Sequence, residues 1–114
     1  MELQFSETNN GIRAIKLSGE LDIIGVGQIE TKFAGYCSGE RVRVVVDMSD
    51  VAYLASIGIR LLVMNAKSLA TRNGKMALLN PNENVLRVLE ISGIPAIIPV
   101  YASMESVEAV LLGS

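Results

Sequence analysis

Apolar residues change their spacing several times along the first half of the chain. Two short strand-like stretches, residues 3–6 and 12–18, flank the pair Asn10-Gly11, which is typical of a hairpin turn, so we expect them to pair antiparallel. Residues 26–36 then place apolar side chains every three or four positions, as on one face of a helix.

The middle of the chain predicts a strand, a loop and a long helix. Residues 42–46 are almost all β-branched, which is typical of a parallel strand covered on both faces. Residues 47–55 should form the loop that leaves the carboxyl end of this strand. A helix then begins at Ser56 and ends near position 72, where Gly74 can supply the left-handed residue that terminates helices.

The last third of the chain predicts two strands and two helices. We expect a strand over residues 76–79, a helix that begins at Pro81, a strand over residues 96–101 and a helix capped by Ser103. The apolar positions that these helices should bury are Val85, Leu86, Leu89, Val107, Val110 and Leu111. The alternation predicts a single α/β domain over residues 1–114, with a mostly parallel central sheet, an antiparallel N-terminal strand pair and about four helices.

The long helix carries two stripes of residues at helical spacing. One stripe is apolar and should face the core: Ile59, Leu62, Ala66 and Leu69. The other is mixed and should face outward: Ser56, Arg60, Met64, Lys67 and Thr71. An outward stripe of this composition is either an ordinary solvated face or a docking face for another protein.

Composition and charge exclude several classes of function. The formal net charge is −2 and Lys and Arg form no run, so the electrostatic attraction that nucleic-acid binding needs has no source. No apolar stretch reaches the roughly 18 residues that a membrane-spanning helix needs. The N-terminus lacks the basic and apolar segments of an export signal. We therefore expect a cytoplasmic protein that binds neither nucleic acid nor membrane.

The chain lacks the residues that most catalytic and metal-binding sites need. The chain has no histidine and one cysteine, so neither a histidine-activated nucleophile nor a zinc site can be assembled, and Cys37 should pack as a small hydrophobe. Four carboxylates could hold a hard cation: Glu20, Asp22, Asp47 and Asp50. Aspartates at strand ends more often cap turns, so we expect no metal, no cofactor and no enzymatic activity.

Ser56 is singled out by its position. Its side chain can accept hydrogen bonds from the unpaired N–H groups at the start of the helix, and this N-cap role is the simplest interpretation. It also follows the carboxyl end of the predicted central strand, where open α/β sheets generally place their binding sites. The residue pattern alone leaves both interpretations open.

Several motifs together resemble the STAS family, the domain of bacterial anti-sigma factor antagonists. They are Gly19-Glu20-Leu21-Asp22, Val44-Val45-Val46-Asp47-Met48-Ser49, Val51-Ala52-Tyr53-Leu54, Ala55-Ser56-Ile57-Gly58-Ile59 and Ile91-Ser92-Gly93-Ile94, and in order they cover essentially the whole chain. The resemblance implies that a partner which is both serine kinase and anti-sigma factor phosphorylates Ser56. It also implies that a metal-dependent serine phosphatase removes the phosphate, and that the unmodified protein binds the anti-sigma factor and frees sigma.

Three positions depart from the family pattern. Ala55 stands where the family often has Asp, and Ile57 stands where it often has Ser or Thr. Gly25 replaces a Thr or Ser, which should leave the first helix without a strong side-chain cap.

Three hypotheses about function follow. The leading one is a phosphorylation-gated protein-binding module, a monomer that is not an enzyme, with these partner-binding residues: Asp22, Tyr53, Leu54, Ala55, Ser56, Ile57, Gly58, Ile59, Arg60, Met64 and Lys67. The second, favoured by Ala55 and Ile57, is a constitutive scaffold or a subunit of another complex in which Ser56 only caps its helix. The third is a nucleotide-binding or other small-molecule domain that uses the helix N-terminus as an anion site near Asp22 and Asp47.

Overall fold

Strands alternate with helices along almost the entire chain in the computed structural model, which describes residues 1–113. The elements are β1 (Glu2–Glu7), β2 (Ile12–Leu21), α1 (Ile23–Tyr36), β3 (Arg43–Leu54), α2 (Ser56–Thr71), β4 (Lys75–Leu79), α3 (Glu83–Ile91), the 3-10 helix η1 (Ile94–Ala96), β5 (Val100–Tyr101) and α4 (Met104–Leu112).

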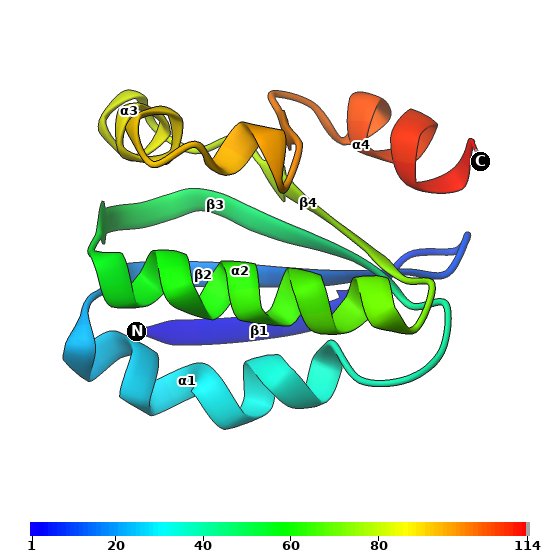
Figure 1. Cartoon of the computed structure of the whole chain (residues 1–114), viewed down its shortest axis with the longest axis horizontal. Helices are drawn as coiled ribbons and strands as arrows, with labels where there is room; N and C mark the ends of the chain where they lie inside the picture. Colours follow the sequence, from blue (N-terminus) through cyan, green and yellow to red (C-terminus); the bar gives the residue numbers. More distant parts are fainter. Residues whose placement is uncertain (114) are drawn as a thin grey trace.

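The strands form one five-stranded sheet in the order β1-β2-β3-β4-β5. β1 and β2 pair antiparallel, and every other neighbouring pair is parallel. Figure 1 shows α1 and α2 side by side on one side of the sheet, with α3 and α4 on the other. The predicted α/β class, the antiparallel N-terminal pair and the four helices are therefore confirmed.

The sheet is covered on both faces, which explains the β-branched stretch in β3. Val44 is fully buried in the larger of two apolar clusters, together with Phe33 of α1 and Leu62 of α2. The neighbouring Val45 belongs to the smaller cluster, which includes Leu111 of α4. Successive residues of a strand point to opposite faces, so a central strand covered on both sides needs apolar side chains at consecutive positions.

β3 is longer than the sequence pattern predicts. It continues to Leu54, so residues 47–54, expected as a loop, form the second half of a central strand. The physical reason is pairing, because β2 also extends to Leu21, whose Cα lies opposite that of Leu54. The register of this pair shifts twice, which interrupts the alternation of buried and exposed positions by which a strand is recognised in a sequence.

The region after α3 also differs from the prediction. The strand expected over residues 96–101 is reduced to the two residues of β5, because residues 94–96 form η1 instead. Gly93 turns the chain at the end of α3 with a φ of 73°. In α4, Leu111 is buried as predicted, whereas Val110 is 38% exposed.

α2 confirms most of what its sequence predicts. All five residues of the outward stripe are exposed, whereas Leu62 and Leu69 are fully buried and Ile59 and Ala66 are half-buried. Its end differs in detail, because Asn73 and not Gly74 takes the left-handed conformation, with a φ of 61°. Gly74 is required for a different reason: a Cβ there would lie 2.5 Å from the carbonyl oxygen of Val42.

Candidate functional site

α1 and α2 begin beside each other at the carboxyl edge of the sheet. The strands that precede them end as neighbours, and the Ala55 N–H donates to the Leu21 carbonyl oxygen at 3.0 Å. Gly58, in the first turn of α2, lies against the same segment, since a Cβ there would be 2.8 Å from the Leu21 oxygen. The two helix starts therefore form one continuous surface.

The start of α1 is held by Asp22, contrary to the expectation that this helix lacks a cap. Its carboxylate Oδ1 accepts a hydrogen bond from the Gly25 N–H at 2.8 Å. Gly25 approaches the end of β2 so closely that a Cβ would lie 1.9 Å from the Glu20 carbonyl oxygen. The small residue at position 25 is thus needed for packing, and the residue three positions earlier supplies the cap.

The start of α2 is different, and the N-cap interpretation of Ser56 is wrong. Ala55 occupies the N-cap position and offers no side-chain acceptor, while Ser56 is the first residue of the helix. The other three α-helices have capping side chains, from Asp22, Asn82 and Ser103. Within residues 1–113 the hydroxyl of the exposed Ser56 has no hydrogen-bond partner, so it is accessible and has no structural task.

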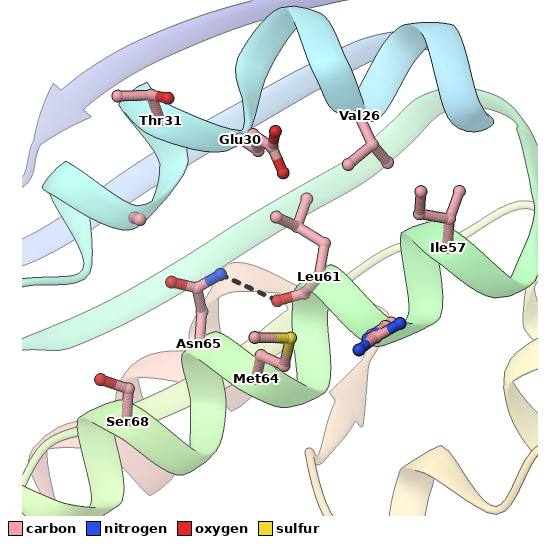
Figure 2. Close-up of a pocket in the computed structure, with 10 residues that line it drawn as sticks. Val26, Glu30, Thr31, Ile57, Leu61, Met64, Asn65 and Ser68 are labelled. Carbon is pink, nitrogen blue, oxygen red and sulfur yellow. Dashed lines mark hydrogen bonds between the residues drawn. The ribbon is translucent and has the colours of Figure 1, made fainter.

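Two neighbouring depressions lie at or near this serine. A hollow of about 410 Å³ is lined by Ile23, Ala55, Ser56, Ile57 and Arg60. A groove of about 680 Å³ then follows the seam between α1 and α2, with Ile57 and Arg60 lining both depressions. Figure 2 shows Val26 and Ile57 pointing into this seam from the two helices. The surface next to Ser56 is therefore concave and largely apolar.

The structure divides the predicted partner-binding residues into three groups. Exposed are Tyr53, Ser56, Arg60, Met64 and Lys67. Half-buried are Asp22, Ala55, Ile57 and Ile59. Leu54 and Gly58 are buried, so they support this surface from beneath and do not present side chains to a partner.

Sequence reasoning missed two exposed apolar residues at the same place. Ile23 and Ile24, in the first turn of α1, are 75% and 72% exposed, and Ile23 lines the hollow with Ser56. A signal was available, because this pair precedes the residues at helical spacing that α1 buries. Exposed apolar side chains gathered at one site are typical of a protein-binding surface.

Three of the four carboxylates proposed as cation ligands have other partners. Asp22 already caps α1. Asp47 accepts hydrogen bonds from the backbone N–H and the hydroxyl of Ser49, and Asp50 pairs with Lys16 at 3.2 Å. Within residues 1–113, no three His, Cys, Asp or Glu side chains are grouped so that they could hold a metal ion. No helix in that same range is both long enough and apolar enough to cross a membrane.

Comparisons with known proteins agree with this architecture. BtrV of Bordetella bronchiseptica, which carries the name of an anti-sigma factor antagonist, is 31% identical over 100 residues that cover 88% of this chain and 86% of BtrV. The anti-sigma factor antagonist SpoIIAA of Bacillus shares the fold at 24% identity, with a TM-score of 0.77 for its unphosphorylated form over 96% of both chains. Its phosphorylated form has a TM-score of 0.71, over 96% of this chain and 99% of that chain.

The same fold also occurs as part of a much larger protein. The murine anion transporter Slc26a9 matches 91% of this chain with a TM-score of 0.78 at 14% identity, but the match covers only 18% of the transporter chain. The model of the STAS domain matches residues 6–107. Because that match spans nearly the whole chain, and BtrV is similar over most of its length, the chain belongs to the STAS domain family.

Proposed function

We propose that this protein is an anti-sigma factor antagonist that binds an anti-sigma factor with serine kinase activity. Its docking surface consists of the exposed residues Ile23, Ile24, Tyr53, Ser56, Arg60, Met64 and Lys67. In this proposal the unmodified protein binds the anti-sigma factor and sigma is released. Phosphorylation of Ser56 by the same partner then ends the interaction.

The proposal rests mainly on the accessibility of the Ser56 hydroxyl. It is exposed and has no hydrogen-bond partner within residues 1–113, so a kinase can reach it without unfolding α2. It also borders a hollow with apolar walls, including Ile23. A phosphate adds a charge of about −1.5 to −2, and burying it in an apolar contact carries a large desolvation cost. Modification of this one atom can therefore prevent docking.

The relatives support this assignment. BtrV and SpoIIAA are both named as anti-sigma factor antagonists, and SpoIIAA is known in an unphosphorylated and a phosphorylated form. By analogy, we assign this protein the role of a kinase substrate and not of an enzyme. A metal-dependent serine phosphatase would restore the unmodified state, and the protein would act as a cytoplasmic monomer.

A constitutive scaffold is the second candidate function. Two residues beside Ser56 favour it, because Ala55 and Ile57 replace the polar residues that the family often has on either side of the serine. In that case the same docking surface would bind a partner permanently. The occurrence of this fold within Slc26a9 shows that such a domain can also be one part of a larger protein.

A binding experiment separates the two candidates. The wild-type protein, Ser56→Ala and Ser56→Asp are used to recover partners from the source cell, and affinities for each purified kinase are then measured by calorimetry. We expect Ser56→Ala to bind without being phosphorylated, and Ser56→Asp to bind at least tenfold more weakly, which is about 1.4 kcal/mol. Equal affinity of wild type and Ser56→Asp would support the scaffold.

Ser106→Asp is the matched control for this experiment. Ser106 is exposed in the first turn of α4, which lies on the opposite side of the sheet from α2, and an aspartate there can still accept the hydrogen bond that the Ser103 hydroxyl donates. We expect this variant to bind like wild type. Recovery of no kinase by any of these proteins would contradict the proposed antagonist function.

A further inference from the structure

Arg60 is a cation with no partner among residues 1–113, and it lies in an apolar part of the surface. It is exposed and lines both the hollow at Ser56 and the groove between α1 and α2. Within residues 1–113 its guanidinium makes no hydrogen bond and no ion pair. Some other cations have defined partners: Arg13 donates to the Tyr36 carbonyl oxygen at 2.8 Å, and Lys16 pairs with Asp50.

Ser56 and Arg60 are placed to interact if the serine acquires a charge. They lie four residues apart in α2, a spacing that puts both side chains on one face of a helix with their Cβ atoms about 5–6 Å apart. This order, with the anion N-terminal to the cation, is also the more favourable one. Because both residues line one hollow, a phosphate on Ser56 and the guanidinium would share the same space.

No acidic side chain competes for that position within α2 itself. The first turn of the helix contains no acidic residue. Across the junction, the Asp22 carboxylate already accepts the hydrogen bond of the Gly25 N–H. Glu30 of α1 lines the groove together with Arg60 but forms no ion pair with it within residues 1–113. An arginine can bind a phosphate through two parallel N–H···O hydrogen bonds, which are stronger than hydrogen bonds between neutral groups. The phosphate is thus the anion best placed to take this guanidinium.

We infer that Arg60 couples phosphorylation of Ser56 to the loss of partner binding, an inference that rests on the proposed function. In the unmodified protein, the guanidinium pairs with an acidic side chain of the anti-sigma factor. After phosphorylation, the phosphate oxygens of Ser56 pair with the same guanidinium within one helix. Phosphorylation therefore makes the Arg60 guanidinium unavailable to the partner, in addition to placing negative charge on the docking surface.

Competition for Arg60 and simple repulsion of the partner have different consequences for the isolated protein. Pairing within α2 stabilises the phosphorylated protein and favours the dianionic form of the phosphate, which lowers its second pKa from the usual value of about 6. Repulsion of a partner involves no contact within the protein, so it leaves both properties independent of Arg60. The two mechanisms can thus be distinguished without any partner.

The experiment uses phosphoserine incorporated at position 56 during protein synthesis, so no kinase is needed. Unmodified and phosphorylated forms are prepared of the wild type, of Arg60→Gln, and of the control Lys67→Gln, which changes an exposed cation of α2 that lines neither depression. Phosphorus NMR titration gives the second pKa of the phosphate. Thermal unfolding gives the change in Tm on phosphorylation.

In the wild type and Lys67→Gln, we expect phosphorylation to raise Tm by about 2–5 °C, and in Arg60→Gln we expect that rise to be largely lost. The pKa of the phosphate should be roughly half a unit higher in Arg60→Gln than in the other two proteins. Equal pKa values in all three proteins, or equal changes in Tm, would overturn the inference.

A second measurement uses the anti-sigma factor kinase. Arg60→Gln should weaken binding of the unmodified protein and should also reduce the additional loss that phosphorylation causes, because the two changes act on one interaction. Independent effects of the two changes would contradict the shared role of Arg60. If no such kinase exists, the proposed function is wrong, and so is the proposed pairing of Arg60 with an acidic side chain of a partner. The NMR titration still decides whether the phosphate pairs with Arg60.

Discussion

Cys37 shows how packing decides the chemistry of a single residue. The side chain is 1% exposed and belongs to the larger apolar cluster, which confirms the expectation that it packs as a small hydrophobe. Burial raises the pKa of the Cys37 thiol to about 12 from the usual 9.0, and the nearby guanidinium groups of Arg13 and Arg72 only partly oppose this shift. The thiol is therefore protonated and unreactive in the folded protein.

This shift predicts how stability depends on pH. Because the pKa is higher in the folded than in the unfolded protein, the contribution of Cys37 is fully present below pH 9.0 and is lost as pH rises from there towards about 12. Urea unfolding at several pH values should show the wild type losing stability above pH 9.0 more steeply than Cys37→Ala. Parallel pH profiles of the two proteins would contradict the assignment.

At the scale of elements, two glycines of α1 differ in what the structure requires of them. A Cβ at position 25 would lie 1.9 Å from the Glu20 carbonyl oxygen, whereas a Cβ at position 27 would meet no heavy atom of residues 1–113 within 4 Å, apart from its chain neighbours and the nearby backbone of its own helix. We expect Gly25→Ala to lower the free energy of unfolding by about 2–4 kcal/mol, because the start of α1 must move. Gly27→Ala should raise it by about 0.5–1 kcal/mol, because alanine is the better helix former.

Urea denaturation of the two variants tests this contrast, and each serves as the control for the other. Both substitutions add one methyl group to the first two turns of the same helix, so only the surroundings differ. Similar changes in stability would show that the close approach of α1 to β2 is not maintained in solution.

The missing cap of α2 leads to a second prediction at this scale. Ala55 already has the extended backbone of an N-cap residue, with φ −93° and ψ 168°. An aspartate there could accept hydrogen bonds from the first turn as Asp22 does in α1, so Ala55→Asp should stabilise the protein by about 0.5–2 kcal/mol. Ser56→Ala should change stability by less than about 0.5 kcal/mol, because the serine is not the cap.

Thermal unfolding of these two variants provides the measurement. Ala55→Ser is a suitable third variant, because it adds a capping oxygen without a charge. A loss of about 1 kcal/mol in Ser56→Ala would restore the interpretation of Ser56 as an N-cap. Stabilisation by Ala55→Asp but not by Ala55→Ser would indicate that charge, and not capping, is responsible.

At the scale of the whole molecule, the two apolar clusters share one sheet. Val44 and Val45 are adjacent in β3 and belong to different clusters. The face covered by α4 therefore cannot lose its packing without disturbing the strands that also support α1 and α2. We expect the domain to unfold as a single cooperative unit, as small single domains usually do.

Leu111→Ala tests this coupling between the two faces. Leu111 is 1% exposed in the smaller cluster, and its truncation should cost about 2–5 kcal/mol. Circular dichroism and tyrosine fluorescence should report one transition, shifted to lower temperature. A separate early transition, with the signal of the remaining structure unchanged, would show that α4 unfolds independently.

The sequence by itself determined the fold class and most of the elements. Helical spacing predicted both stripes of α2, and the β-branched stretch predicted a strand covered on both faces. These signals are local, because they follow from the 3.6-residue period of a helix and the two-residue period of a strand. The motif around Ser56 also indicated the family.

Only the tertiary structure decided how the helix starts meet. The pairing of Leu21 with Leu54 extends β3 through the expected loop and brings α1 next to α2. That contact places Ile23 in the same hollow as Ser56 and requires glycine at position 58, because a Cβ there would lie 2.8 Å from the Leu21 carbonyl oxygen. It also leaves Ser56 as the first residue of α2, where its hydroxyl has no hydrogen-bond partner within residues 1–113. These features depend on contacts between segments about thirty residues apart, which local spacing does not encode.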